Sequence, residues 1–420
     1  MNMKILFLTI GLPDMAKHNG GFYADLIQEM AHNGQEMTAI APALEGQETN
    51  VHQEGDVKVL RVKTKAFVGN FSTLTKVIGV MRMNPNYKKA YKRYLWQESF
   101  DWVIMPTPPA SLVSVVDYVV KHTRARFYIL LRDIHPESRV RIPDSSVLAR
   151  TDVYEECKKP YVQLGIIRYS LYRNAQKGYK RADLIGCMSK ANMDFVKKIA
   201  PYISNEIIKL LPNWYKEPET TISFDNDAIR RKYGLTGKFV AIFGGNITIA
   251  QAVWNIATLA KHNLDKTDVV FLIVGKGDSK AVLQDMAQRD GLTNIIFLDY
   301  MPREDYEQIL KAADIGLISI DEKYKVPTCP SKIIGYMALK KPVLAMFNEG
   351  NDYGNYYMGG NTCGLWSVGL DHQKMFENFD WLYSHPDERK KMGEAGYAYY
   401  KSNFDVKVVC DELCKQLENG

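Results

Sequence analysis

The strongest constraint on the fold is a pattern that occurs twice: a short apolar run, a glycine pair and a helix-forming segment. Residues 3–10 read MKILFLTI and precede a glycine pair at 20–21, whereas residues 238–246 read KFVAIFGGN and contain the second pair. Near-continuous apolar runs of this length are typical of parallel strands covered on both faces. The pattern therefore predicts an α/β fold with two doubly wound sheets, each with a glycine loop at the carboxyl end of its first strand.

Further apolar runs continue this alternation along the 420 residues, a length that exceeds one hydrophobic core. The predicted strands are residues 36–42, 58–64 (edge-like), 101–106, 126–131, 182–190, 207–213, 268–277, 294–300, 313–320 and 343–346. Residues 214–226 are polar and contain proline, as linkers do. We expect an N-terminal domain at 1–213, a C-terminal domain at 214–395 and a last helix at 396–420.

The amino-acid composition and the length of the apolar segments indicate where in the cell the protein is located. The chain is 46% hydrophobic and 24% charged, values typical of a globular rather than a disordered protein. No apolar run reaches the roughly 18–20 residues that cross a bilayer, and residues 5–10 are too short for a signal-peptide core. We therefore expect a cytoplasmic protein.

Positive charge is concentrated between Lys58 and Arg93, a stretch without Asp or Glu. Within it, a helix predicted at 86–97 has an aromatic face of Tyr87, Tyr91, Tyr94 and Leu95 and a face of lysines and arginine. Such a helix can lie on anionic lipid with its aromatic residues at the headgroup level. It can equally be a solvated helix whose tyrosines pack in the core. Nucleic acid ranks last, because no nucleic-acid-binding motif accompanies the patch.

The segment 329–345, CPSKIIGYMALKKPVLA, predicts a loop, a helix and a buried strand. The free N–H groups at a helix start attract anions, and a lysine there adds a full charge. The predicted ligands of a diphosphate are Ser331, Lys332, Ile333 and Ile334. The alternative is an ordinary capped helix that binds only water.

Polar residues also follow the strand at 126–131. Asp133 and His135 alternate on the chain and would face the same way, so they could orient or deprotonate a hydroxyl group. The alternative is a capped loop in which Asp133 accepts backbone hydrogen bonds.

The 329–345 segment resembles the donor-site motif of retaining GT-B-fold glycosyltransferases of family 4, in the branch that builds bacterial surface polysaccharides. There a PSK-type turn precedes a helix reading roughly LxEYMAxGKPV. The matching residues are Pro330, Ser331, Lys332, Tyr336, Met337, Ala338, Lys341, Pro342 and Val343. Both carboxylates of the family's usual pair are absent, since their positions hold Pro327 and Gly335. Glu322, in the preceding loop, could reach the donor ribose instead.

The resemblance implies a GT-B fold: two Rossmann-like domains face a cleft, and the C-terminal helix crosses back to the first domain. It also implies that the second domain binds a nucleotide sugar. The residues implied near the diphosphate are Gly244, Gly245, Asn246, Gln251 and Lys276, and those implied near the base are Asp299, Tyr300 and Met301. Gly20 and Gly21 match the loop beside the donor phosphates and acceptor, and 133–138 looks like the D-x-x-P-E-S loop at the acceptor pocket.

The implied activity is retaining, metal-independent transfer of a sugar from a nucleotide sugar, with UDP favoured, to a lipid-linked saccharide at the inner face of the cell membrane. The nucleotide sugar is a substrate, and no cofactor is expected. An Asp-x-Asp pair, Asp225 and Asp227, lies in the linker region rather than at a strand end where a metal site would need it. Two alternatives are a UDP-sugar epimerase of the same fold and, because of Gly335, a catalytically weakened binding or scaffold subunit.

Overall fold

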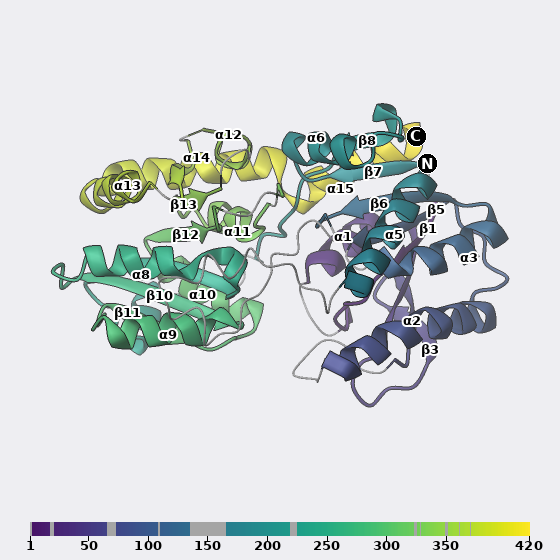
Figure 1. The fold of residues 1–420 in the computed structure, drawn as a ribbon, viewed down its shortest axis with the longest axis horizontal. Helices are drawn as coiled ribbons and strands as arrows, with labels where there is room; N and C mark the ends of the chain where they lie inside the picture. The colour runs from purple at the N-terminus through teal and green to yellow at the C-terminus, as the bar shows by residue number, and fades with distance from the viewer. Residues whose placement is uncertain are drawn as a thin grey trace. The chain divides into compact units, whose positions relative to one another are not determined.

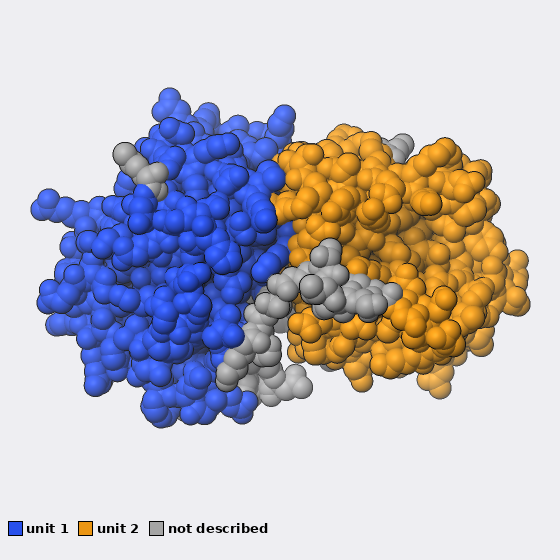
Figure 2. Space-filling view, turned by 180° about the vertical axis from the view of Figure 1, so that it is seen from behind, with its two compact units in different colours: residues 1–138, 162–216, 406–420 blue, residues 139–161, 217–405 orange. Residues whose placement is uncertain are grey.

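The computed structural model describes residues 2–16, 21–64, 73–107, 110–134, 165–218, 225–322, 326–327, 329–348, 352–360, 362–369 and 371–420, with the side chains of 73–81, 165–171 and 249 excepted. The chain divides into two compact units (Figure 2). Unit 1 comprises residues 1–138, 162–216 and 406–420, and unit 2 comprises residues 139–161 and 217–405.

Unit 1 is built on an eight-stranded sheet in the order β3-β4-β2-β1-β5-β6-β7-β8 (Figure 1). The strands are β1 (Lys4–Leu8), β2 (Glu36–Pro42), β3 (Asn50–Glu54), β4 (Val57–Val62), β5 (Trp102–Thr107), β6 (Arg126–Leu131), β7 (Leu184–Cys187) and β8 (Ile208–Leu210). All neighbours pair in parallel except β3 with β4. The strand predicted at 58–64 is therefore not at the edge, because β3 covers its outer side.

The helices of unit 1 connect these strands and cover the sheet. They are α1 (Phe22–His32), α2 (Thr73–Tyr94), α3 (Val113–Thr123), α5 (Gly165–Arg181), α6 (Lys190–Ile199) and α15 (Val406–Asn419), with short 3-10 turns η1 (Ala110–Leu112) and η3 (Asn205–Ile207). Ser189 caps α6 by accepting a hydrogen bond from the Asn192 amide. These connections are the helices that parallel strands require.

Unit 2 contains an all-parallel six-stranded sheet in the order β11-β10-β9-β12-β13-β14. The strands are β9 (Phe239–Asn246), β10 (Val269–Lys276), β11 (Ile295–Leu298), β12 (Ile315–Ser319), β13 (Val343–Phe347) and β14 (Gly364–Val368). The helices are α7 (Asn226–Lys232), α8 (Val253–His262), α9 (Ser279–Arg289), α10 (Arg303–Ala312), α11 (Lys332–Ala338), α12 (Tyr353–Tyr356), α13 (His372–Ser384) and α14 (Pro386–Asn403), with the turn η4 (Ile249–Gln251). The prediction of two Rossmann-like parallel sheets is confirmed.

The C-terminal helix belongs to unit 1, as expected. It packs on α1, and the Tyr128 hydroxyl donates to Gln416 Oε1 at 2.8 Å. The boundary before it lies at 405/406 rather than at 395/396, because α14 runs unbroken to Asn403 and packs on α11 in unit 2. That packing is close: a Cβ on Gly393 would lie 2.2 Å from the carbonyl oxygen of Lys340. The first boundary, at 216/217, lies just after the predicted 213/214.

Candidate functional site

The carboxyl edge of the unit 2 sheet has a change of direction at its centre. From β9 the chain continues outward through β10 and β11, and it then returns to β12 on the other side of β9. Ligands of open α/β sheets bind at such a switch point, where two loops leave in opposite directions. The predicted donor residues at 244–251 lie at or just after the end of β9. Those at the start of α11 come after β12, the strand on the other side of this point.

Gly244 and Gly245 lie within the last three residues of β9, which pair with β10. A side chain would have little room at Gly244 and open space at Gly245. A Cβ on Gly244 would lie 2.1 Å from the Tyr306 hydroxyl oxygen, so this position excludes any side chain. Gly245 has φ +102°, which L-residues rarely adopt, and the nearest atom to its Cβ position is Lys332 Cε at 4.0 Å. The glycines thus bring the β9 backbone next to the lysine.

Lys332 is the charged group at this edge. Its ammonium donates to Gln251 Oε1 at 2.8 Å and lies 3.8 Å from the centre of the Phe243 ring. Burial lowers the pKa of Lys332 to about 7. The structure therefore brings together Gly245, Gln251 and Lys332, three of the residues that the sequence predicted for the donor site. It adds Phe243, which the sequence reasoning missed although it directly precedes the glycine pair.

Helix α11 is fixed by Tyr336, which is fully buried beneath the sheet. A Cβ on Gly316 of β12 would lie 2.2 Å from the Tyr336 ring, so the glycine admits the ring. The Tyr336 hydroxyl reaches the carbonyl oxygens of Leu317 and Ile242, at 3.2 and 3.4 Å. The ring thus spans from β12 to β9 and places the start of α11 beside the glycine turn.

The amides at the start of α11 are less available than predicted. The Ile333 amide donates to the carbonyl oxygen of Pro330 at 3.2 Å, and the Ile334 amide donates to that of Ser331 at 3.1 Å. Both isoleucine side chains are fully buried. Ser331 is exposed, and its side chain makes no capping hydrogen bond. At the start of α11 the positive charge is therefore that of the Lys332 ammonium rather than that of these amides.

The residues predicted near the base, 299–301, directly follow β11. Lys276 lies over the Tyr300 ring, with its nitrogen 4.4 Å from the ring centre, and Tyr300 is 65% exposed. The Asp299 carboxylate pairs with Lys280 at 2.7 Å, which lowers the pKa of Asp299. Lys280 also donates to the carbonyl oxygens of Gly275 and Leu298, so it holds the ends of β10 and β11 together. Met301 follows this exposed segment.

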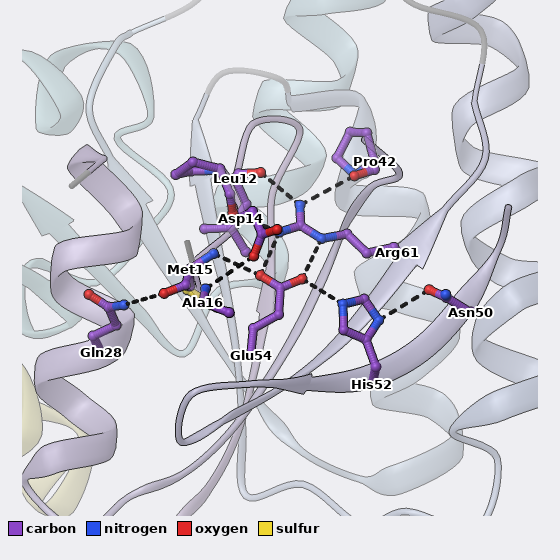
Figure 3. A network of polar contacts seen from close by, with 11 residues as sticks. Leu12, Asp14, Met15, Ala16, Gln28, Pro42, Asn50, His52, Glu54 and Arg61 are labelled. Carbon is purple, nitrogen blue, oxygen red and sulfur yellow. Dashed lines mark hydrogen bonds and ion pairs between the residues drawn. The ribbon is translucent and has the colours of Figure 1, made fainter. Parts of the chain in front are cut away.

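In unit 1, a buried ion pair holds the loop that follows β1 (Figure 3). The fully buried Arg61 guanidinium donates to Glu54 Oε1 and Oε2 at 2.8 and 2.7 Å. It also donates to the carbonyl oxygens of Leu12 and Pro13 at 2.7 and 2.6 Å. Glu54 Oε2 in turn accepts from the Met15 amide at 2.9 Å. One arginine on β4 therefore fixes the conformation of residues 12–15.

The ionised form of Glu54 is favoured despite burial. Burial raises the pKa of Glu54, but hydrogen bonds from Arg61 and the Met15 amide outweigh this, so the pKa lies below its usual value. His52 adds a contact of 3.0 Å from its Nε2 to Glu54 Oε1. Both charged groups therefore have hydrogen-bond partners in addition to each other, as a buried ion pair requires.

The same loop supports the predicted glycine at position 21. Gly21 is the N-cap of α1, and a Cβ on it would lie 2.8 Å from Pro13 Cγ. The glycine therefore allows the start of α1 to pack against the segment that Arg61 holds. Gly20 lies outside the described residues.

Asp133 follows β6 at the carboxyl edge of the unit 1 sheet. Its carbonyl oxygen accepts a hydrogen bond from the Thr107 hydroxyl at 3.2 Å, which ties the ends of β5 and β6. Burial raises the pKa of Tyr23 on α1 to about 12, and Arg132 and Asp133 have smaller effects of opposite sign on it. His135, its predicted companion, lies outside the described residues.

The structure of α2 contradicts one interpretation of the basic helix predicted at 86–97. Tyr87, Tyr91 and Leu95 are at most 1% exposed. The Tyr87 hydroxyl donates to the carbonyl oxygen of Thr9 at 2.9 Å, and that of Tyr94 to the carbonyl oxygen of Thr49 at 3.1 Å. The prediction that these aromatic residues lie at a headgroup level is therefore wrong, because they belong to the core and its rim. The exposed part of this helix end is basic: Lys89, Lys92 and Arg93.

Neither a membrane-crossing helix nor a cluster of metal ligands is found in the part of the chain that the structure describes. Within the described ranges, no helix is both long and apolar enough to cross a bilayer. In the same ranges, no three or more His, Cys, Asp or Glu side chains gather as a metal site would require.

Comparison with known proteins identifies relatives of the second unit. Residues 225–399 match the family model described as "Glycosyl transferases group 1". A putative colanic acid biosynthesis glycosyl transferase, WcaI of Escherichia coli K12, is 28% identical over 167 residues. That match covers 39% of this chain and 40% of the relative's length. The comparisons do not support the epimerase alternative.

Solved structures of the same fold match the whole chain. Sucrose-phosphate synthase from Thermosynechococcus elongatus has a TM-score of 0.75 at 12% identity, with 100% of this chain and 99% of that chain covered. Anabaena HepE in complex with UDP and glucose has a TM-score of 0.67 at 16% identity, with both chains covered completely. WaaG, a glycosyltransferase involved in lipopolysaccharide biosynthesis, has a TM-score of 0.65 at 13% identity and coverage of 99% and 100%. The chain therefore has the GT-B fold, and its second unit is similar to the group 1 glycosyl transferases.

Proposed function

We propose that this protein is a glycosyltransferase that binds a nucleotide sugar, with UDP as the nucleotide, at the carboxyl edge of the unit 2 sheet. One observation carries the proposal. The Lys332 ammonium lies beside the Gly245 turn and donates to the neutral Gln251, and no carboxylate among the described residues pairs with it. A diphosphate would supply the missing negative charge. The similarity of residues 225–399 to group 1 glycosyl transferases favours a sugar nucleotide over other diphosphates.

In this proposal the chain stabilises the leaving group electrostatically. Lys332 and the backbone of 244–246 hold the diphosphate, and their positive charge and dipoles offset the charge that develops on it. Lys276 adds positive charge near the diphosphate, and the 299–301 segment contacts the base. The transfer proceeds with retention and without a metal ion, since Lys332 takes the place of a divalent cation. Asp133 and His135 orient the acceptor hydroxyl, and Gly20 and Gly21 let the acceptor approach the backbone.

We further propose a lipid-linked saccharide as the acceptor, in the synthesis of a cell-surface polysaccharide at the inner face of the cell membrane. The involvement of WaaG in lipopolysaccharide biosynthesis and the putative role of WcaI in colanic acid biosynthesis support this choice. In unit 1, the exposed Lys89, Lys92 and Arg93 would contact anionic headgroups through charge alone, because the tyrosines of the same helix are packed inward.

Binding and turnover test the donor proposal. Purified protein is screened for thermal stabilisation by UDP, UDP-glucose, UDP-galactose, UDP-N-acetylglucosamine and GDP-mannose, and donor hydrolysis is then followed with and without EDTA. We expect a UDP compound to give the largest stabilisation and the hydrolysis to persist in EDTA. NMR of the released sugar or product reports the anomeric configuration. Failure of every nucleotide to bind would favour the scaffold alternative, and loss of activity in EDTA would reject metal independence.

Vesicle flotation tests the membrane proposal. The variant Lys89→Gln/Lys92→Gln/Arg93→Gln should bind anionic vesicles more weakly, by about fivefold for each charge removed, at about 1 kcal/mol per charge. Neither protein should bind zwitterionic vesicles. Lys390→Gln/Lys391→Gln on α14 is the matched control and should behave like wild type, since it removes exposed charge from the other unit. Equal flotation of the triple variant and wild type would contradict the proposal.

A further inference from the structure

Glu322 carries an unsatisfied buried oxygen close to the end of β12. The side chain is partly buried, its Oε2 is fully buried, and among the described residues that oxygen has no hydrogen-bond partner. Burying a carboxylate oxygen without a donor is costly, and proteins rarely leave one in that state. The oxygen is therefore a candidate to accept hydrogen bonds from a ligand.

The neighbours of Glu322 place it at the same sheet edge as Lys332. The amide of the preceding residue, Asp321, donates to the carbonyl oxygen of Ala250 at 3.0 Å. Gln251, the next residue after Ala250, accepts the Lys332 ammonium at 2.8 Å. The loop after β12 and the loop after β9 are thus joined by backbone contact directly beside the proposed diphosphate site.

On its other side, Glu322 approaches the ends of β13 and β14. A Cβ on Gly369 would lie 3.6 Å from the Cβ of Glu322, and the Gly369 amide donates to the carbonyl oxygen of Phe347 at 2.8 Å. A side chain at position 369 would therefore make ordinary van der Waals contact with Glu322. The carboxylate is thus held above the strand ends at the carboxyl edge.

We propose that Glu322 accepts hydrogen bonds from a pair of neighbouring hydroxyl groups on the nucleotide-sugar donor. The inference rests on the proposed function, and the pair belongs either to the ribose or to the transferred sugar. An ionised carboxylate offers two acceptor oxygens and no donor, which matches a vicinal diol. This chain has no carboxylate at 327 or 335 to serve that purpose, since those positions hold proline and glycine.

A metal ion is a poorer match for this carboxylate. Among the residues that the structure describes, Glu322 belongs to no group of three or more potential metal ligands. Lys332 at the same sheet edge donates to Gln251 rather than to Glu322. Neutral hydroxyl donors therefore fit the site better than a cation.

Calorimetric titrations of the full chain test the inference. Wild type, Glu322→Gln and the control Glu304→Gln, which changes an exposed glutamate on α10, are each titrated with UDP, 2′,3′-dideoxy-UDP and UDP-glucose. We expect Glu322→Gln to bind UDP-glucose about 10- to 100-fold more weakly than wild type, as loss of charge-assisted hydrogen bonds predicts. Glu304→Gln should bind as wild type does.

The ligand series distinguishes the two sources of hydroxyl groups. If the ribose is bound, wild type prefers UDP to dideoxy-UDP and Glu322→Gln loses that preference. If the transferred sugar is bound, the variant loses affinity for UDP-glucose but not for UDP. Equal affinities of wild type and variant for all three ligands would overturn the inference while leaving the proposed function intact. Absence of binding by wild type itself would overturn both.

Thermal melting without nucleotide gives a second readout. Because Glu322 Oε2 is buried without a hydrogen-bond partner among the described residues, replacing the carboxylate with a neutral amide should raise the midpoint for unit 2 by about 2–4 °C. A lower midpoint in Glu322→Gln would indicate a structural partner for the carboxylate and would contradict the ligand role.

Discussion

A fully buried cation lies near the carboxyl edge of the unit 1 sheet and a partly buried one near that of the unit 2 sheet, and their surroundings differ. In unit 1, Arg61 makes two hydrogen bonds to Glu54 and further bonds to the carbonyl oxygens of Leu12 and Pro13, so protein groups match its charge. In unit 2, Lys332 has a neutral amide oxygen and an aromatic ring as its partners. The comparison separates a cation whose charge the protein itself matches from one that we propose binds an anionic ligand.

The largest expected effect comes from breaking the matched pair. Arg61→Met should lower the free energy of unfolding of unit 1 by about 3–5 kcal/mol, because Glu54 would remain charged and buried without its partner. Denaturation in urea, followed by the fluorescence of the buried Trp214, measures this. The double variant Arg61→Met/Glu54→Leu should recover most of the loss, since it removes both charges.

An exposed pair in the same unit provides the control for this prediction. Lys63 pairs with Glu48 at the surface, with side chains 61% and 76% exposed, and Lys63→Met should cost at most about 1 kcal/mol. If Arg61→Met costs no more than Lys63→Met, the buried pair does not have the structural role given to it here.

The unmatched cation should show the reverse effect. Lys332→Met should weaken UDP binding by about 2 kcal/mol, or roughly 30-fold, by removing the charged donor. Stability should stay the same or increase. Burial lowers the pKa of Lys332 to about 7, so between pH 7 and its unfolded value the native state holds fewer protons and stability rises with pH. The cost of burying the charged lysine is therefore complete at pH 7 and below. In that range Lys332→Met should gain most stability relative to wild type.

A smaller effect on stability is expected from a substitution of Gly245, which lies at the end of β9 beside Lys332. Gly245→Ala should lower the free energy of unfolding of unit 2 by about 1–2 kcal/mol, because φ is +102° at this position. Gly11→Ala in unit 1 is the matched control, since no atom lies within 4 Å of its Cβ position, and it should change stability by less than about 0.5 kcal/mol. Similar denaturation midpoints for both variants would show that position 245 does not require glycine.

The sequence predicted the parallel sheets well because continuous apolar runs mark strands that are buried on both faces. It missed β3 and β14, which lie at sheet edges and carry mixed or short patterns. It identified Lys332 through the motif that surrounds it. It did not identify the Arg61–Glu54 pair, because in a count of charges Arg61 is one more basic residue, whereas in the structure it is fully buried. Charge along a sequence does not show which cations a fold has already neutralised.

The aromatic face of the basic helix illustrates the same limit. Its helical spacing fits a membrane surface and a core face equally well, and only the contact of Tyr87 with Thr9 distinguishes them. Which amides at the start of α11 are free also depends on the turn geometry there, which composition does not determine.

Proton uptake on nucleotide binding tests the role of Lys332 most directly. At pH 8 the free protein has most of Lys332 neutral, since burial lowers its pKa to about 7, and a bound diphosphate should restore the charged form. Calorimetry with UDP at pH 8, in two buffers of different ionisation enthalpy, should give close to one proton taken up per nucleotide in wild type and none in Lys332→Met. Binding without proton uptake in wild type, or with equal affinity in both proteins, would contradict the assignment of Lys332 as the diphosphate ligand.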